Sequence, residues 1–168
     1  MTQPFTETQL PRQWWMWAIV ALPVAVAVWG FVEQIILGRP FGNKPAPDFA
    51  IYALITLMAL IVWLLFAIRL DSWVDESGVH YRFVPFHLRP RSIAWSEVTQ
   101  VHVRSYRPIP EYGGWGIRYG FRNGWAYNMS GRSGLQLVLR SGKKILIGTR
   151  RPDELKAYLT SIGKGSTP

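Results

Sequence analysis

Two long apolar segments near the amino terminus constrain this chain more than any other feature of its sequence. Residues 14–37 contain one charged side chain, Glu33, and residues 49–68 contain none. A helix needs roughly 20 predominantly apolar residues to cross the hydrocarbon core of a bilayer, so each segment is long enough. The sequence therefore predicts a transmembrane hairpin over residues 14–68, with spans at about 14–37 and 49–68.

The flanks of the two segments agree with this interpretation. Trp14, Trp15 and Trp17 follow Arg12, an aromatic and basic edge typical of a headgroup region. A cleaved signal peptide would not explain the second segment. The connector, residues 38–48, is rich in glycine and proline, so it forms an irregular turn and makes the spans antiparallel. Glu33 lies near the end of its span, and we expect its carboxyl group to reach the interface.

The positive charge of the chain is concentrated after the second span. The chain carries a net charge of +9, yet the three basic side chains before residue 69 are balanced by three acidic ones. Basic segments next to membrane spans favour the cytoplasmic side, so both termini are expected there. The chain has no cysteine, which excludes disulfides, thiolate metal sites and CxxC redox centres.

Residues 69–163 show the patterning of a small α+β domain. Val79, Tyr81 and Phe83 alternate with polar residues, as in a half-buried strand, and the turn-like Glu76-Ser77-Gly78 before them indicates a strand pair from about Leu70. Similar alternation predicts strands around residues 93–95, 101–103, 135–139 and 145–147, the last two forming a hairpin that turns at Ser141-Gly142. Residues 115–127 add a hairpin turning near Asn123-Gly124. Pro152 opens an amphipathic helix that ends before Gly163. We expect about seven antiparallel strands in a bent sheet or partly open barrel, closed by this helix, with tails at 1–13 and 164–168.

Three pieces of this domain resemble motifs of bacterial PH-like (pleckstrin-homology-like) domains. They are Ile93-x-Trp95-x-Glu97-Val98-x-x-Val101, Trp115-Gly116-Ile117-Arg118, and Ile147-Gly148-Thr149-Arg150-Arg151-Pro152-Asp153-Glu154-Leu155. The resemblance covers roughly residues 69–163 and implies a bacterial inner-membrane protein with a membrane hairpin, from families of mostly unassigned function. It implies structural roles for Ile93 and Trp95 in the sheet core. Phosphoinositide-binding relatives carry a basic first loop, whereas this loop contains Asp75 and Glu76, so that activity is not expected.

Residues capable of catalysis or metal binding do not form a recognisable pattern. The spacings of His80, His87 and His102 match no common metal motif. The serines at 130 and 133 lie among glycines but fail the GxSxG pattern. We therefore predict no catalytic residue, no metal ligand and no cofactor site, and expect the chain not to be an enzyme.

Arginines and aromatic residues supply the candidate contact surfaces. Such mixtures suit an anionic membrane surface, and they also suit nucleic acid. Because the domain begins directly after a predicted span, the membrane surface is preferred, and a merely solvated basic face remains the alternative. The candidate anionic-surface contacts are Arg89, Arg91, Arg104, Arg107, Arg118, Arg122, Arg150 and Arg151, and the candidate partner surface is Tyr112, Trp115, Tyr119 and Trp125.

Together these features predict a membrane-anchored, non-catalytic binding or scaffolding module. Its basic domain is expected to contact anionic lipid, a partner protein or a second copy of the chain. One alternative is a component of a transport or enzyme assembly, for which Glu33 is the only charged residue within the spans. A second alternative is a nucleic-acid-binding domain.

Overall fold

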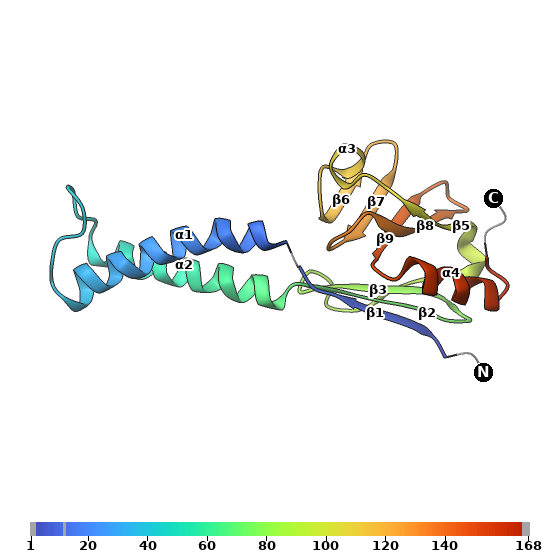
Figure 1. Cartoon of the computed structure of the whole chain (residues 1–168), viewed down its shortest axis with the longest axis horizontal. Coiled ribbons are helices and arrows are strands. Elements are labelled where there is room, and N and C mark those ends of the chain that lie inside the picture. The colour runs from blue at the N-terminus through green and yellow to red at the C-terminus, as the bar shows by residue number, and fades with distance from the viewer. Residues whose placement is uncertain (1–2, 12, 166–168) are drawn as a thin grey trace. The chain divides into compact units, whose positions relative to one another are not determined.

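The computed structural model describes residues 3–11 and 13–165 and divides into two compact units. The helical unit comprises residues 12–67, and the β-unit combines residues 1–11 with residues 68–168 (Figure 1). Arg12 at the predicted membrane edge and residues 166–168 of the predicted tail lie outside the described residues. The β-unit is thus discontinuous in sequence, and the helical unit is inserted into it.

The helical unit is an antiparallel pair of helices, as the sequence predicts. It contains helix α1 (Trp14–Phe31), the π-helical turn η1 (Val32–Ile36) and helix α2 (Asp48–Ala67). Both helices are long and apolar enough to cross a membrane, and among their residues only Ala27, Gly30 and Ile51 are buried. A helix that is apolar on all sides is normally buried in protein or lipid, because such a surface is unfavourable in water.

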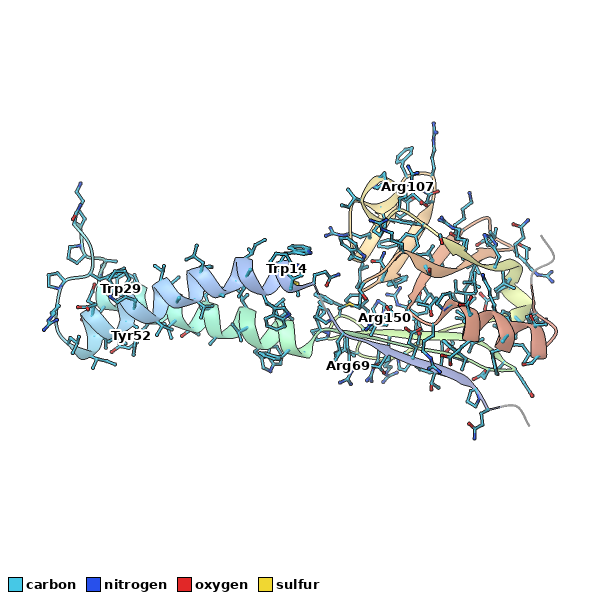
Figure 2. The ribbon with its side chains drawn as sticks, viewed as in Figure 1. Trp14, Trp29, Tyr52, Arg69, Arg107 and Arg150 are labelled. Atoms are coloured by element: carbon cyan, nitrogen blue, oxygen red, sulfur yellow. The ribbon has the colours of Figure 1, made fainter. Side chains whose placement is uncertain are left out.

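Aromatic and polar contacts hold the two helices together near both ends. Trp17 and Phe66 pack with ring centroids 5.1 Å apart near one end, and Phe31 and Tyr52 pack at 6.0 Å near the other. Figure 2 shows Trp14 at the opposite end of the helical pair from Trp29 and Tyr52. At the connector, the Gln34 amide donates to the Ala46 carbonyl and to the Asp48 carboxyl group, at 2.6 and 2.8 Å.

The β-unit contains two sheets and two helices among its described residues (Figure 1). Sheet A has the order β1-β2-β3-β4, and sheet B has the order β5-β8-β9-β7-β6. The strands are β1 (Phe5–Gln9), β2 (Arg69–Val74), β3 (Gly78–Val84), β4 (Arg91–Ala94), β5 (Val98–Ser105), β6 (Gly116–Gly120), β7 (Gly124–Asn128), β8 (Ser133–Leu139) and β9 (Lys144–Thr149). The remaining elements are the 3-10 turn η2 (Trp95–Glu97) and helices α3 (Pro108–Tyr112) and α4 (Pro152–Ser161).

This architecture confirms an α+β domain and corrects its details. The predicted hairpins β2–β3, β6–β7 and β8–β9 are present. The described residues form nine strands, more than the predicted seven, and they pair antiparallel as predicted except for β9, which pairs with β7 in parallel. The strands lie in two sheets that do not close into a barrel. Residues 5–9, predicted as part of a tail, form the edge strand β1.

The two sheets differ in how they are buried. In β2 and β3, buried and partly exposed residues alternate, as expected for a sheet with one covered face. In β8 and β9, four successive residues are buried, which requires cover on both faces. One face of sheet B contributes to the main core, and the other packs Ala126 and Leu146 against Tyr106 and Tyr112.

The main core lies between the sheets and includes the terminal helix. Leu70 and Phe83 from sheet A and Leu135 and Leu137 from sheet B belong to one buried cluster, each at most 1% exposed. Leu155 and Leu159 bring the apolar face of α4 into the same cluster. The predicted core residue Ile93 is buried there, whereas Trp95 is only partly buried at the cluster's margin, and its indole N–H donates to the Asp75 carbonyl.

Strand β1 connects sheet A to the carboxyl-terminal end of β9 in sheet B. Its residue Glu7 is 8% exposed and pairs opposite Ser72 of β2. The carboxyl group of Glu7 accepts hydrogen bonds from the Thr149 hydroxyl at 2.6 Å and from the Arg150 backbone N–H at 2.8 Å. Because unpaired buried polar groups are costly, these bonds fix β1 to the junction between β9 and α4.

The other two inward residues of β1 strengthen the same junction. Gln9 is fully buried and donates from its amide to the Gly148 carbonyl at 2.6 Å. Phe5 belongs to the main core, and the Arg151 guanidinium lies 5.3 Å from its ring centroid. Strand β1 therefore contributes one apolar and two polar side chains to the interior of the β-unit.

We predict that the β-unit requires β1. A chain in which residues 10–69 are replaced by an Asn-Gly turn joins Gln9 to its strand partner Leu70, and it should unfold cooperatively in water. Residues 68–168 alone should be less stable by at least about 3 kcal/mol, because the buried ring of Phe5 is lost. Urea unfolding followed by tryptophan fluorescence compares the two chains. Equal stability would contradict the structural role of β1.

Candidate functional site

The β6–β7 hairpin carries the most exposed aromatic side chains of the β-unit's sheets. Tyr119 and Trp125 face each other across the two strands, with ring centroids 5.3 Å apart, and they are 59% and 45% exposed. At the turn, Phe121 is 97% exposed and Arg122 is exposed beside it. We call Tyr119, Phe121, Arg122 and Trp125 the hairpin-tip surface.

Glycine is needed where this hairpin meets sheet B. Gly124 has a φ of 74°, a left-handed conformation that other residues rarely adopt, and a Cβ there would overlap the carbonyl oxygen of Lys144. The predicted Asn123-Gly124 turn thus also allows β9 to approach β7 in parallel. This approach places the lysines of the β8–β9 turn beside the aromatic hairpin.

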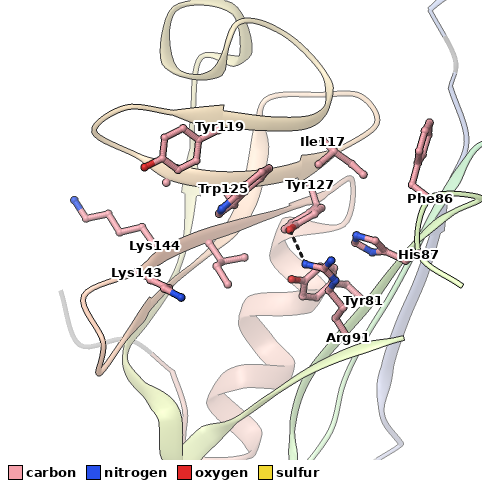
Figure 3. Close-up of a pocket in the computed structure, with 12 residues that line it drawn as sticks. Tyr81, Phe86, His87, Arg91, Ile117, Tyr119, Trp125, Tyr127, Lys143 and Lys144 are labelled. Carbon is pink, nitrogen blue, oxygen red and sulfur yellow. Dashed lines mark hydrogen bonds between the residues drawn. The ribbon is translucent and has the colours of Figure 1, made fainter. Parts of the chain in front are cut away.

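A cavity of about 640 Å³ opens beside the hairpin, within the β-unit (Figure 3). Strands β3 and β4 and the loop between them supply one side of its lining, and β6, β7 and the start of β9 supply the other. The lining residues are Tyr81, Phe86, His87, Arg91, Ile117, Tyr119, Gly124, Trp125, Tyr127, Lys143, Lys144 and Ile145. This volume lies within the range of roughly 300 to 1,000 Å³ that is usual for small-molecule sites.

Polar groups converge where sheet A lines the cavity. The Arg91 guanidinium donates to the Tyr127 hydroxyl at 3.4 Å (Figure 3). The Nδ1 atom of His87 accepts from the backbone N–H of Phe83 at 3.2 Å, so the neutral ring carries its proton on Nε2. Burial, and then the nearby Arg91, lower the pKa of His87 and favour this neutral form. Burial and the neighbouring Tyr127 raise the pKa of Tyr81, which keeps its hydroxyl protonated.

Two of the predicted contact residues, Arg104 and Tyr112, belong to a polar network within the β-unit. Arg104 pairs with the Glu111 carboxylate at 2.8 Å and donates to the Gln136 amide oxygen and the Tyr112 hydroxyl. Tyr112 is 4% exposed and packs against Tyr106 on the outer face of sheet B. Burial raises the pKa of Tyr106 to about 12, and its hydroxyl accepts from Asn128. These contacts fasten α3 to sheet B, so Tyr112 offers no partner surface.

Arg150 and Arg151 lie at the start of α4, where β1 packs. The backbone of Arg150 is bonded to Glu7, and its side chain is exposed. The Arg151 side chain forms an ion pair with Glu154 and donates to the Thr6 carbonyl at 3.1 Å. Arg151 thus contributes to the attachment of β1.

The other predicted residues are distributed over several elements. Arg89 is exposed in the β3–β4 loop, Arg107 precedes α3, and Arg118 is exposed on β6. Arg118 donates to the Trp115 carbonyl at 2.9 Å, and the Trp115 indole donates to the Gly131 carbonyl at 3.1 Å. Of the twelve predicted contact residues, only Arg91, Tyr119 and Trp125 line the cavity.

Sequence reasoning missed several residues that the fold brings to the cavity. Lys143 and Lys144 follow the predicted Ser141-Gly142 turn, and their adjacency was the available signal. The buried pair Tyr81 and Tyr127 comes from different sheets, with ring centroids 4.6 Å apart. No spacing in the sequence relates these two residues.

A Ser–His–Asp arrangement occurs elsewhere, on β3 and β4, and has a structural explanation. His80 Nδ1 lies 2.8 Å from the Ser92 hydroxyl, and its Nε2 lies 3.1 Å from an Asp75 carboxylate oxygen. However, Asp75 also accepts from the backbone N–H groups of Ser77 and Gly78, at 2.8 and 3.1 Å. These are the contacts of a side chain that caps the β2–β3 turn. The described residues contain no group of three acidic or histidine side chains suited to a metal ion.

No protein-family model matches this chain, and no curated protein matches its sequence.

The Asp75 contacts predict a pH-dependent contribution to stability. Partial burial alone would raise the pKa of Asp75, but hydrogen bonds from Ser77, His80 and Gly78 outweigh it and lower the pKa to about 2. The unfolded chain protonates this carboxyl near pH 4, so its stabilising effect is complete above that pH and lost as the pH falls through about 2.

Asp75→Asn should therefore destabilise the β-unit by about 1 kcal/mol at neutral pH, after allowance for solvent screening. The difference from wild type should shrink between about pH 4 and pH 2. Urea unfolding across this range measures it. Glu76→Gln, at an exposed neighbour, removes the same charge and serves as the control. A loss that stays constant down to pH 2 would contradict the proposed cap.

Proposed function

We propose that this chain is a two-span protein of a bacterial inner membrane whose β-unit is a non-catalytic binding module for anionic lipid. In this proposal both spans cross the membrane, and the β-unit lies on the cytoplasmic side. The observation that carries the lipid contact is the hairpin-tip surface, on which Phe121 is almost fully exposed beside Arg122.

The dimensions of the helical unit support the membrane location. Helix α2 has 20 residues, which corresponds to a length of about 30 Å, close to the thickness of the hydrocarbon core. Aromatic residues lie near both ends of the pair, as at the two interfaces of a bilayer. The low burial of the helices argues against the core helices of a soluble protein.

Pairing of β1 with β2 supports an even number of crossings. Strand β1 ends at Gln9, β2 begins at Arg69, and both helices lie between them. Because the two strands pair over five residues, they must be on the same side of any membrane that the helices cross. A signal peptide cleaved after α1 would remove β1 and the buried side chains of Phe5, Glu7 and Gln9.

The charge and exposure of the hairpin tip support contact with lipid headgroups. An exposed phenylalanine gains free energy on entering the interface, and each nearby basic residue adds about 1 kcal/mol at an anionic surface. Tyr119 and Trp125 are amphipathic side chains of the type that settles at headgroups. Because the hairpin-tip residues lie on one short hairpin, their contacts with lipid would fall within a small area.

We also propose that the β-unit is a PH-like domain. Helix α4 follows the last strand and packs into the core between the sheets, in agreement with the resemblance found in the sequence. Strand β1 and the parallel β7–β9 pair depart from the expected pattern. The acidic β2–β3 turn is capped by its own backbone contacts, so lipid contact is assigned to the β6–β7 turn instead.

Hydrogen–deuterium exchange of the full chain in nanodiscs tests the lipid contact. Backbone amides of residues 118–125 should exchange more slowly in anionic than in zwitterionic nanodiscs. Added salt should reverse this protection, because it screens exposed charges.

Matched variants separate a local contact from a general charge effect. Arg118→Glu/Arg122→Glu should abolish the protection, whereas Arg132→Glu/Arg140→Glu, which makes the same charge change at exposed positions outside the tip, should retain it. Equal exchange in both kinds of nanodisc, or equal loss in both variants, would refute contact by the hairpin tip.

A further inference from the structure

The charged residues that line the cavity beside the β6–β7 hairpin are all basic among those described. Of the described residues that line it, none is acidic, and Arg91, Lys143 and Lys144 are basic. Arg91 contacts the Tyr127 hydroxyl, a neutral acceptor that leaves the guanidinium charge uncompensated. Lys144 donates to the Arg122 carbonyl at 3.4 Å, which is likewise a neutral partner. These cations therefore favour an anionic occupant.

Hydrogen-bond donors reach this cavity from both sides. The Arg91 guanidinium on β4 and the His87 Nε2–H in the β3–β4 loop lie on one side of the cavity, and Lys143 and Lys144, at the start of β9, line the other side. Figure 3 shows His87, Arg91 and Tyr81 on one side and Trp125, Lys143 and Lys144 on the other. Donors on opposite sides of a cavity suit a group with several acceptor oxygens, such as a phosphate or carboxylate.

The remaining lining is apolar and aromatic. Phe86 is 58% exposed, and Trp125 and Tyr119 are also substantially exposed where they line the cavity. Ile117 and Ile145 complete the apolar part. Small-molecule sites combine such apolar walls with a few converging polar groups.

We propose that this cavity binds an amphipathic anion, in which a phosphate or carboxylate is joined to an apolar body. The anionic group lies among Arg91, Lys143 and Lys144, and the apolar body packs against Trp125 and Phe86. This proposal rests on the proposed role of the β-unit as a binding module. It uses residues other than the exposed Arg122 and Phe121, and its chemistry fits either a membrane lipid or a soluble organic phosphate.

The test uses the full chain in zwitterionic nanodiscs and hexyl phosphate as the probe. Isothermal titration calorimetry, corrected with empty nanodiscs, should detect saturable binding. Inorganic phosphate and hexanol, each of which supplies only half of the ligand chemistry, should bind at least about tenfold more weakly. Equal binding of inorganic phosphate and hexyl phosphate would overturn the role of the apolar walls.

Two double variants test the cationic residues with the same change in charge. Lys143→Gln/Lys144→Gln should weaken hexyl phosphate binding at least about tenfold, because it removes two cations that line the cavity. Arg132→Gln/Arg140→Gln makes the same charge change at exposed positions outside both the lining and the hairpin tip, and it should leave the affinity unchanged. Arg91→Gln should act like the lysine variant, and thermal unfolding checks that each variant is folded. Undetectable binding by wild type, or equal affinity of the two double variants, would overturn the proposal.

Competition identifies the source of the ligand. Loss of hexyl phosphate binding in nanodiscs that contain phosphatidylglycerol would assign the site to a membrane lipid, and unchanged binding would assign it to a soluble organic phosphate. This readout is separate from amide exchange at residues 118–125. If hexyl phosphate binds but the hairpin tip is not protected, only the proposed tip contact is refuted. If the tip is protected but hexyl phosphate does not bind, only the cavity proposal is refuted.

Discussion

The β-unit depends on a pairing between strands that lie on either side of an inserted helical hairpin. Strand β1 pairs with β2, and Glu7 is also hydrogen-bonded to Thr149 and Arg150 at the far end of the domain sequence. These contacts connect sheet A to the junction of β9 and α4, from which α4 enters the main core. The helical unit is thus connected to the β-unit twice along the chain, before α1 and after α2.

Elements whose burial follows a simple hydrophobic pattern were predictable from the sequence. The two apolar helices and the alternating strands of sheet A follow directly from hydrophobicity and its period. Sheet B was harder, because its central strands are covered on both faces and the insertion of β9 beside β7 creates a parallel pair. Strand β1 was missed because its inward residues include Glu7 and Gln9, which are polar in sequence but paired and buried in the fold.

In the candidate site, some residues were recognisable by their type, and others are brought together only by the tertiary fold. Tyr119 and Trp125 were predicted from their chemistry, and they do line the cavity. Arg104 and Tyr112 were also predicted from their residue types, yet they are held in a network that fastens α3 to sheet B. Lys143, Lys144 and His87 reach the cavity only because strands distant in sequence pack together. Residue type alone did not distinguish residues that line the cavity from residues held in the internal network.

The position of the helical hairpin between β1 and β2 has a consequence for biosynthesis. During translation, β1 emerges first, the two helices follow, and β2 emerges only after both helices are complete. In the proposed topology, β1 then has no strand partner until the second helix has returned the chain to the starting side. A chain stalled after one crossing would leave β1 and the rest of the β-unit on opposite sides. Completion of sheet A is therefore possible only for molecules that have inserted both helices.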